Sequence, residues 1–234
     1  EADGELYDCL EVIKVDKNTD YALIPIEQTS TSTIANYFES EIFISKLEIP
    51  IPGLHNLSNI NAAIAACRIQ NISFDKIKEK ISLLKLPHKR FEFKGSIAGR
   101  EIIDDYAHHP REIKATLELG RLFIKDKNKY ERLIAIFQPH RFTRVNEFFK
   151  EFANELSLAD EIILTNIYSA GELNIKNINS SIIANELYKI NKKVNIVKDN
   201  YEIKKKFNSL TKENDLVINM GAGDCHNLWQ ILIN

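Results

Sequence analysis

Short apolar segments alternate with amphipathic segments through the second half of this 234-residue chain. Apolar runs rich in β-branched residues predict strands, and apolar residues three and four positions apart predict helices. The expected strands are 91–97, 101–104, 132–137, 161–165, 194–198 and 215–220, and the expected helices are 110–124, 144–157, 180–190, 200–209 and 224–232. Strands that alternate with helices form a mostly parallel sheet with helices on both faces. We therefore predict an α/β fold for this part of the chain.

The first part of the chain has a different pattern. Alternating segments predict short antiparallel strands, and two helical patterns follow a pair of prolines. The strands are expected at 8–15, 21–27 and 42–49, and the helices at about 56–67 and 74–84. A polar joint with a proline occupies residues 86–90. We place a domain boundary there, which gives an α+β segment over residues 1–88 and a second domain over residues 89–234.

Composition narrows the class of protein. With 44% apolar residues the chain is globular, and its net charge of -2 gives no electrostatic basis for binding nucleic acid. The apolar runs are shorter than the roughly 18 residues of a membrane span, and the N-terminus does not resemble a signal peptide. Three scattered cysteines, Cys9, Cys67 and Cys225, predict reduced thiols and a cytoplasmic location. Because Met220 is the first methionine, we expect a piece of a longer protein.

Two carboxylates and two imidazoles lie at and just after the end of the strand expected at 101–104. They are Asp104, Asp105, His108 and His109, and Pro110 follows as a suitable first residue of a helix. A carboxylate at the end of such a strand binds a ribose hydroxyl or a metal, and a histidine before a helix orients or deprotonates a substrate. The alternative is an aspartate helix cap beside a packed Tyr106. The density of polar groups favours a functional site.

A similar arrangement follows the strand expected at 132–137. His140, Arg141 and Arg144 precede the next helix, and two arginines with one histidine suit a carboxylate or phosphate. A pair of surface arginines is the alternative. Since the two groups follow consecutive strands, we expect them to converge. Residues 168–172 and 220–224 also follow predicted strands, and they are expected to line the same rim or to form ordinary turns.

Polar residues also begin the helix expected near residue 56. His55, Asn56 and Asn59 would lie in its first turn, where they can contact a purine or cap the helix. Lys89 and Arg90 form a basic pair after the joint, which either reaches a phosphate or is solvated. The 234 residues contain no G-x-x-x-x-G-K-[ST] loop, no G-x-S-x-G elbow and no H-E-x-x-H motif. A bound nucleotide therefore needs a phosphate-binding loop from elsewhere.

Together these motifs resemble the Mur ligases of peptidoglycan synthesis, and within that family its alanine-adding members. The matching segments, in order, are Gly-Leu-His-Asn-Leu-Ser-Asn, Lys-Arg-Phe-Glu, Asp-Asp-Tyr-Ala-His-His-Pro, Phe-Gln-Pro-His-Arg-Phe-Thr-Arg, Tyr-Ser-Ala-Gly-Glu and Gly-Ala-Gly-Asp, which span residues 53–224. The family has a UDP-binding domain, a central ATPase domain and a Rossmann-like C-terminal domain. The resemblance implies the end of the central domain over 1–88 and the whole C-terminal domain over 89–234.

The resemblance also implies a reaction. An ATP-dependent carbon–nitrogen ligase of this family uses Mg²⁺ and phosphorylates the carboxylate of UDP-N-acetylmuramate, and the amine of L-alanine then attacks the acyl phosphate. Such a protein serves cell wall biogenesis, cell shape and cell division. The P-loop, the Mg²⁺ ligands and the UDP site would lie before residue 1. We expect the chain alone to be inactive.

Site roles follow from the same resemblance. It implies ATP contacts at His55, Asn56, Asn59, Arg90 and Asp105. In this scheme the asparagines contact adenine, Arg90 reaches the phosphates when the domains close, and Asp105 lies near the ribose. Catalytic roles fall to Arg90, Asp105, His108 and His109, and amino-acid binding to His109, His140, Arg141 and Arg144. Which of His108 and His109 faces the substrate is left open, and no metal ligand is assigned.

Three alternatives remain at this point. A murein tripeptide ligase shares the Asp-Asp-aromatic-Ala-His-His-Pro element but lacks the run at 137–144. A metal-dependent hydrolase would use Asp104, Asp105, His108 and His109, although adjacent residues rarely point to one metal. A nucleotide-binding or interaction module would leave Arg141 and Arg144 without a role.

Overall fold

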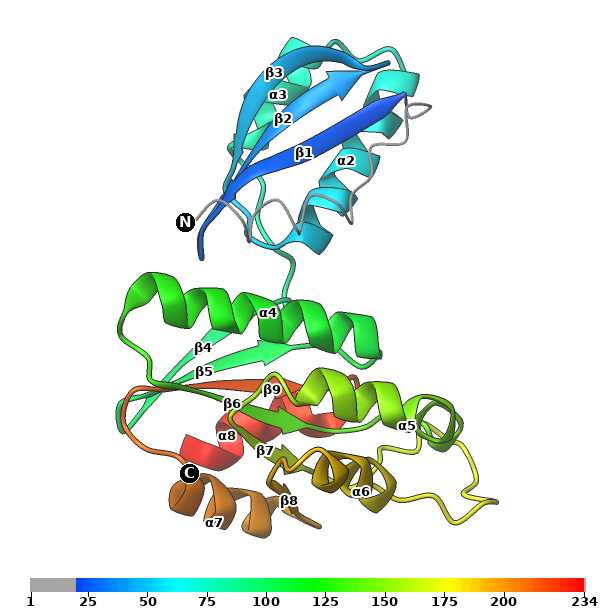
Figure 1. Ribbon diagram of the computed structural model, residues 1–234, viewed down its shortest axis with the longest axis vertical. Helices are drawn as coiled ribbons and strands as arrows, with labels where there is room; N and C mark the ends of the chain where they lie inside the picture. Colours follow the sequence, from blue (N-terminus) through cyan, green and yellow to red (C-terminus); the bar gives the residue numbers. More distant parts are fainter. Residues whose placement is uncertain (1–19, 234) are drawn as a thin grey trace. The chain divides into compact units, whose positions relative to one another are not determined.

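The computed structural model describes residues 20–233, and its contacts divide the chain into two compact units (Figure 1). The first unit ends at Lys85 and the second begins at Leu86. The strand expected at 8–15 lies outside the described residues. The assignment of the two parts to ligase domains remains a prediction.

The first unit contains a three-stranded antiparallel sheet in the order β1-β2-β3. Its elements are β1 (Tyr21–Gln28), β2 (Thr33–Glu39), β3 (Ile42–Ile49), α2 (Leu54–Ile69) and α3 (Phe74–Ile81). The expected strands at 21–27 and 42–49 and both expected helices are confirmed. The ring of Tyr37 is fully buried and stacks on Phe74 with 4.7 Å between centroids, so β2 and α3 share one core.

Strand β2 was not predicted. Its buried positions are Thr33, Ala35 and Tyr37, which alternate as a strand requires but include no aliphatic residue larger than alanine. Such a strand is difficult to predict from sequence, because the main signal for a strand is the spacing of large apolar side chains. Strand β2 is stabilised by pairing with β1 on one side and β3 on the other, which its own side chains do not indicate.

The second unit contains a six-stranded sheet in the order β4-β5-β9-β6-β7-β8. All neighbours are parallel except β4, which runs antiparallel to β5. The strands are β4 (Glu92–Ile97), β5 (Arg100–Asp105), β6 (Arg132–Phe137), β7 (Glu161–Leu164), β8 (Val194–Ile196) and β9 (Asp215–Met220). All six predicted strands are therefore present, and the predicted mostly parallel sheet is confirmed.

Helices cover both faces of this sheet. They are α4 (Pro110–Lys127), α5 (Phe142–Leu156), α6 (Ser181–Lys189), α7 (Asn200–Leu210) and α8 (Leu228–Ile233), with a 3₁₀ turn η1 (Asp224–Asn227) before α8. Ile103 packs in the core with α4, α5 and α6, whereas its neighbour Ile102 packs in the core with α7 and α8. Successive strand residues thus bury opposite faces, as the pleat dictates. The α/β fold class is confirmed.

The chain leaves β5, forms α4 and returns as β6, and β9 lies between these two strands. The carboxyl ends of β5 and β6 therefore flank β9. In open parallel sheets, ligands bind outside the carboxyl ends where the strand order reverses. This edge of the sheet holds the polar groups that follow β5 and β6 in the sequence.

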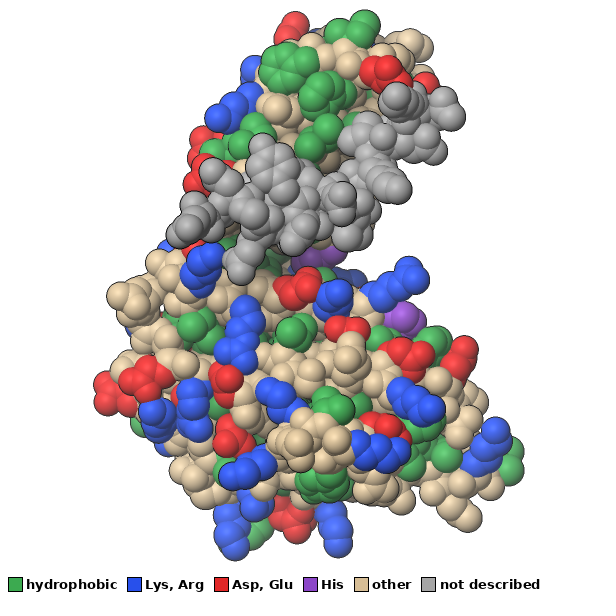
Figure 2. Space-filling model, viewed as in Figure 1, with side chains coloured by type: hydrophobic (Ala, Val, Ile, Leu, Met, Phe, Trp, Pro, Cys, Tyr) green, Lys and Arg blue, Asp and Glu red, His purple; other side chains and the backbone are tan. Residues whose placement is uncertain are grey.

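Charges of both signs cover the visible face of the second unit, where Figure 2 shows Lys and Arg interspersed with Asp and Glu. None of the helices within residues 20–233 is long and apolar enough to cross a membrane.

Gly120 of α4 is a point of close approach between a helix and the sheet. A Cβ atom there would lie 2.7 Å from Cδ1 of Ile218 and 2.9 Å from Cδ1 of Leu133.

Gly120→Val forces these side chains apart, so we expect a loss of about 1–3 kcal/mol in the free energy of unfolding. Urea unfolding measures it. Lys114→Val, at an exposed position of the same helix, is the control, and an equal loss in both variants would contradict the close approach.

Candidate active site at the carboxyl edge of the six-stranded sheet

Asp105 ends β5 as a buried carboxylate that organises the backbone around it. The N–H of Phe91 donates to Oδ2 and the N–H of Ala107 donates to Oδ1, each over 2.8 Å. Burial raises the pKa of Asp105, and these two N–H groups and the charge of Arg90 offset only part of that effect. Asp105 therefore joins the segment before β4 to the loop after β5.

Asp104 belongs to a different cluster. Its Oδ1 accepts from Nδ2 of Asn219 over 2.7 Å, and the same Nδ2 lies 2.9 Å from the carbonyl of Cys225. Adjacent strand residues point to opposite faces, so Asp104 and Asp105 begin on different sides of the sheet. Through Asn219, Asp104 is linked to the turn after β9.

His108 has a defined hydrogen-bonding orientation. Its Nδ1 lies 2.8 Å from the carbonyl oxygen of Tyr106 and 3.3 Å from Oε2 of Glu112. A carbonyl and a carboxylate only accept, so Nδ1 carries the proton in the neutral ring. The other nitrogen, Nε2, is then left as an acceptor.

His109 has a structural contact instead. It is the N-cap of α4, its Nδ1 accepts from the N–H of Arg111 over 3.4 Å, and its ring packs 5.1 Å from the ring of Phe148. Of the two histidines left open by the sequence, His108 faces the other imidazole of the site and His109 caps the helix. A catalytic or binding role for His109 is an untested prediction that the cap does not favour.

No role was predicted for Glu112 from the sequence. It accepts from the N–H groups of His108 and His109 over 3.0 and 3.2 Å, and Nη1 of Arg90 lies 4.0 Å from its other oxygen. Burial alone would raise the pKa of Glu112, but these N–H groups and the charges of His108 and Arg90 together lower it. The signal was available, because an acidic residue at the third position of a helix is half of a capping box.

Four rings stand side by side along the edge of the sheet. The ring centroids are 5.1 Å apart for Tyr106 and His108, 5.6 Å for His108 and His140, and 5.6 Å for His140 and Tyr168. The row spans the loops after β5, β6 and β7. The expected convergence of the first two strand ends is therefore observed at His108 and His140.

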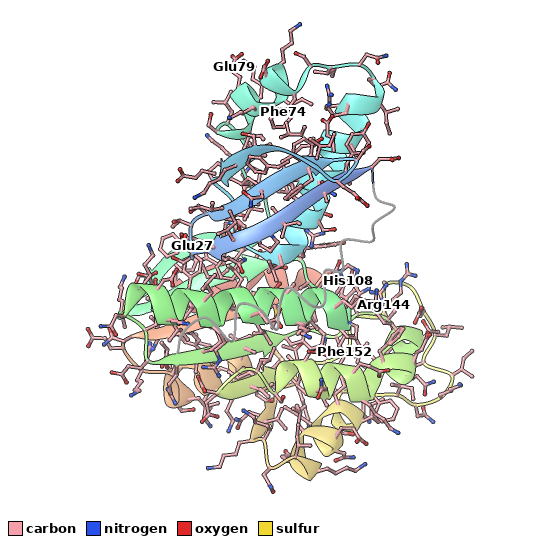
Figure 3. The ribbon with its side chains drawn as sticks, turned by 45° about the horizontal axis from the view of Figure 1, so that its top comes forward. Glu27, Phe74, Glu79, His108, Arg144 and Phe152 are labelled. Atoms are coloured by element: carbon pink, nitrogen blue, oxygen red, sulfur yellow. The ribbon has the colours of Figure 1, made fainter. Side chains whose placement is uncertain are left out.

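The arginines lie beside this row. Nη1 of Arg144 is 3.4 Å from Nδ1 of His140, and Figure 3 shows His108 and Arg144 at the same edge of the unit. Arg141 is the N-cap of α5 with φ +67°, a strained conformation for a residue with a side chain, and its N–H donates to the carbonyl of Tyr168 over 2.8 Å. Two cations therefore flank one imidazole.

The environment of His140 keeps its ring neutral. Burial lowers the pKa of His140, and the charges of His108, Arg144 and Arg141 lower it further. Arg144 can only donate, so Nδ1 of His140 accepts and Nε2 carries the proton. This ring presents a donor where His108 presents an acceptor.

Two further loops reach the same rim. Glu172 accepts from the N–H and the hydroxyl of Thr143 over 3.0 and 2.7 Å, which holds the loop after β7 against the first turn of α5. Nε2 of Gln138 donates to Asp224 over 2.6 Å, which joins the loops after β6 and β9. The expectation that these loops line the rim agrees with their contacts.

The residues at the start of α2 lie in the first unit, apart in sequence from this group. His55 and Asn59 are exposed in the first turns of the helix, and the side chain of Asn56 donates to the carbonyl of Pro52 over 2.7 Å. Asn56 is thus partly used in the local structure. The predicted nucleotide contacts of these three residues remain predictions.

A metal-dependent hydrolase is not favoured by this geometry. Asp104 bonds to Asn219, and Asp105 accepts from backbone N–H groups. His108 bonds to the carbonyl of Tyr106, and His109 caps α4, so the four proposed ligands contact different groups. Within the described part of the chain, no three His, Cys, Asp or Glu side chains are grouped to hold a metal ion.

Comparison with known proteins shows the family of this chain. A family described as "Mur ligase, glutamate ligase domain" matches residues 89–223. The UDP-N-acetylmuramate–L-alanine ligase of Prochlorococcus marinus subsp. pastoris is 61% identical over an alignment of 227 residues, and the match covers 95% of this chain and 48% of that protein. The chain therefore spans about half the length of the curated relatives it matches.

Solved structures show the same fold. The UDP-N-acetylmuramate–alanine ligase MurC from Thermotoga maritima is 25% identical, with a TM-score of 0.73 over 92% of this chain and 45% of that chain. A murein peptide ligase from Psychrobacter arcticus is 22% identical, with a TM-score of 0.68 over 94% of this chain and 44% of that one, a likeness of fold alone. The comparisons do not favour the tripeptide-ligase alternative over the alanine ligases. On these matches, the chain belongs to the Mur ligase family.

Proposed function

We propose that this chain is the amino-acid-positioning part of an ATP-dependent ligase that joins L-alanine to UDP-N-acetylmuramate. The observation that supports it best is the juxtaposition of His108 and His140, 5.6 Å apart, with Arg144 beside His140. In this proposal residues 1–88 are the end of the central ATP-binding domain, and residues 89–234 are the Rossmann-like C-terminal domain.

The arginines and His140 bind the carboxylate of the amino acid. Nε2–H of His140 is a neutral donor, and Arg141 and Arg144 add positive charge and planar donor pairs that suit a carboxylate. A neutral imidazole next to two arginines avoids a third positive charge in the unliganded site. This side of the site fixes the amino acid without contacting its reacting nitrogen.

His108 serves the amine. Its free Nε2 accepts a proton from the ammonium of L-alanine, and Glu112 and the Tyr106 carbonyl hold the ring in the required tautomer. The neutral amine then attacks the carbonyl carbon of the acyl phosphate. A carbon–nitrogen bond forms and the carbon–oxygen bond to phosphate breaks. The phosphate leaves with the bonding electrons and takes the second proton that the nitrogen loses as the amide forms.

ATP binding is assigned residue by residue. Arg90, 44% exposed at the side chain, and the buried Asp105 are the contacts proposed in the second unit, and His55, Asn56 and Asn59 are those proposed in the first. ATP supplies the phosphoryl group that activates the muramyl carboxylate. We assign no ligand for Mg²⁺ to this chain.

A hybrid protein tests the function. In it, this chain replaces the matching 48% of the Prochlorococcus ligase, to which it is 61% identical. We expect phosphate release from ATP that requires both UDP-N-acetylmuramate and L-alanine, and none from the 234-residue chain alone. A folded hybrid that releases no phosphate with L-alanine, or that requires a tripeptide instead, would contradict the proposal.

Substitutions in the hybrid separate the two halves of the site. Arg141→Ala and Arg144→Ala remove carboxylate contacts, so we expect each to raise KM for L-alanine about 10- to 100-fold, because a charged hydrogen bond contributes about 1.5–3 kcal/mol. His108→Gln removes the proton acceptor and should mainly lower kcat, with a weaker dependence of kcat on pH. Steady-state kinetics measures both effects.

Arg111→Ala is the matched control, because Arg111 is an exposed arginine whose backbone alone contacts the site region. It should leave both constants unchanged. Equal effects of all four substitutions on KM would show that charge in general, and not this arrangement, governs binding.

Titration of His140 tests its neutral state. The pKa of His140 is lowered, so NMR of the labelled chain should give a midpoint below the ordinary value near 6.5. The folded protein then binds this proton less readily than the unfolded chain. The contribution of His140 to stability is complete above pH 6.5 and decreases as the pH falls toward the lower folded value.

His140→Asn removes this part of the pH dependence, which unfolding experiments between pH 5 and about 7.5 can measure. Arg144→Ala should move the His140 midpoint upward. A midpoint at or above the ordinary value in the unmodified chain would contradict the lowered pKa of His140 and the neutral donor role assigned to its ring.

A further inference from the structure

A polar cavity lies next to the row of rings. Its volume is about 300 Å³, and it is bordered by the loops after β6, β7, β8 and β9. Polar side chains dominate its lining, including Thr165, Asn166, Ser169, Lys198 and Asp224. None of the contacts described for L-alanine uses this cavity.

Tyr168 belongs both to the row of rings and to the lining of the polar cavity. Its ring is stacked on the imidazole of His140, with centroids 5.6 Å apart and planes at 12°, and it also lines the polar cavity. Tyr106, His108 and His140 do not line that cavity. The phenol ring is therefore the member of the row that adjoins the additional space.

The backbone fixes this tyrosine against His140. The N–H of Tyr168 donates to the carbonyl of Pro139, and the carbonyl of Tyr168 accepts from the N–H of Arg141, both over 2.8 Å. These bonds form a parallel bridge on either side of His140. The ring cannot move away from the imidazole without breaking them or changing its rotamer.

Gly223 approaches the same ring from the loop after β9. A Cβ atom on Gly223 would lie 2.5 Å from Cγ and 2.8 Å from Cβ of Tyr168, and 2.4 Å from Oε1 of Gln138. This close approach calls for glycine at position 223. Tyr168 is thus held by His140 and by a loop that leaves it just enough room.

We propose that Tyr168 is a specificity-determining wall: it separates the amino-acid position beside His140 from the polar cavity and restricts the ligase to small side chains. This inference rests on the proposed function. A methyl side chain needs no space beyond the ring, whereas a longer polar side chain must enter the cavity. Removing the ring joins the two spaces and offers hydroxyl and amide partners to such a side chain.

The test compares amino acids in the hybrid ligase. With Tyr168→Ala, we expect kcat/KM for L-asparagine or L-glutamine relative to L-alanine to rise by about 10-fold or more, the range that small steric differences in a pocket produce. Tyr168→Phe keeps the ring and should keep the preference for L-alanine. Tyr201→Ala, at a tyrosine on α7 that is 76% exposed, is the matched control.

Gly223→Ala provides a second route, since it keeps the tyrosine while its added methyl group presses on Tyr168 and on Oε1 of Gln138. It should broaden the amino-acid profile in the same direction and to a smaller extent. NMR of His140 in the 234-residue chain gives a readout without catalysis: Tyr168→Ala and Gly223→Ala should shift the ring resonances of His140, and Tyr201→Ala should not.

The outcomes are distinguishable. An unmodified hybrid with no L-alanine-dependent turnover would overturn the proposed function, and this inference with it. An active hybrid whose Tyr168→Ala and Gly223→Ala variants retain the L-alanine preference would overturn the wall alone. If Tyr168→Ala does not fold, the Gly223→Ala profile decides.

Discussion

The parallel register of β5, β9 and β6 is the constraint on which the site depends. Asp105 pairs with Met220, and Met220 pairs with Phe137, so the three strands end level with one another. His108 and His140 each follow three residues after these ends, and their rings meet 5.6 Å apart. Hydrogen bonding between strands therefore brings together two imidazoles that the chain separates by an entire helix and strand.

Packing maintains that register. Residues of β5 alternate between a core shared with α4, α5 and α6 and a core shared with α7 and α8, and β6 and β9 do the same. A slip of one residue would exchange the two faces of a strand and place every side chain against the wrong helices. Burial of both faces thus fixes the register of the three strands, and with it the positions of the loops that carry His108 and His140.

Electrostatics then gives similar side chains different tasks. Both histidines are near arginines or carboxylates, but His108 donates from Nδ1 toward Glu112 and a carbonyl, whereas His140 accepts at Nδ1 from Arg144. Opposite tautomers leave one ring with an acceptor and the other with a donor at Nε2. One amino acid presents both an amine and a carboxylate, and such a pair of rings is suited to both.

The sequence by itself determined the fold class, the six strands of the second unit and the polar groups at the ends of β5 and β6, because apolar spacing and turn chemistry are local signals. The sequence did not predict strand β2, because the buried residues Thr33, Ala35 and Tyr37 form no pattern of large apolar side chains and the strand is stabilised by its neighbours. Only the tertiary structure decided that His108 and not His109 faces His140, that Glu112 orients it, and that Tyr168 adjoins the polar cavity. These assignments depend on side-chain directions and on contacts between loops far apart in the chain, which local spacing does not encode.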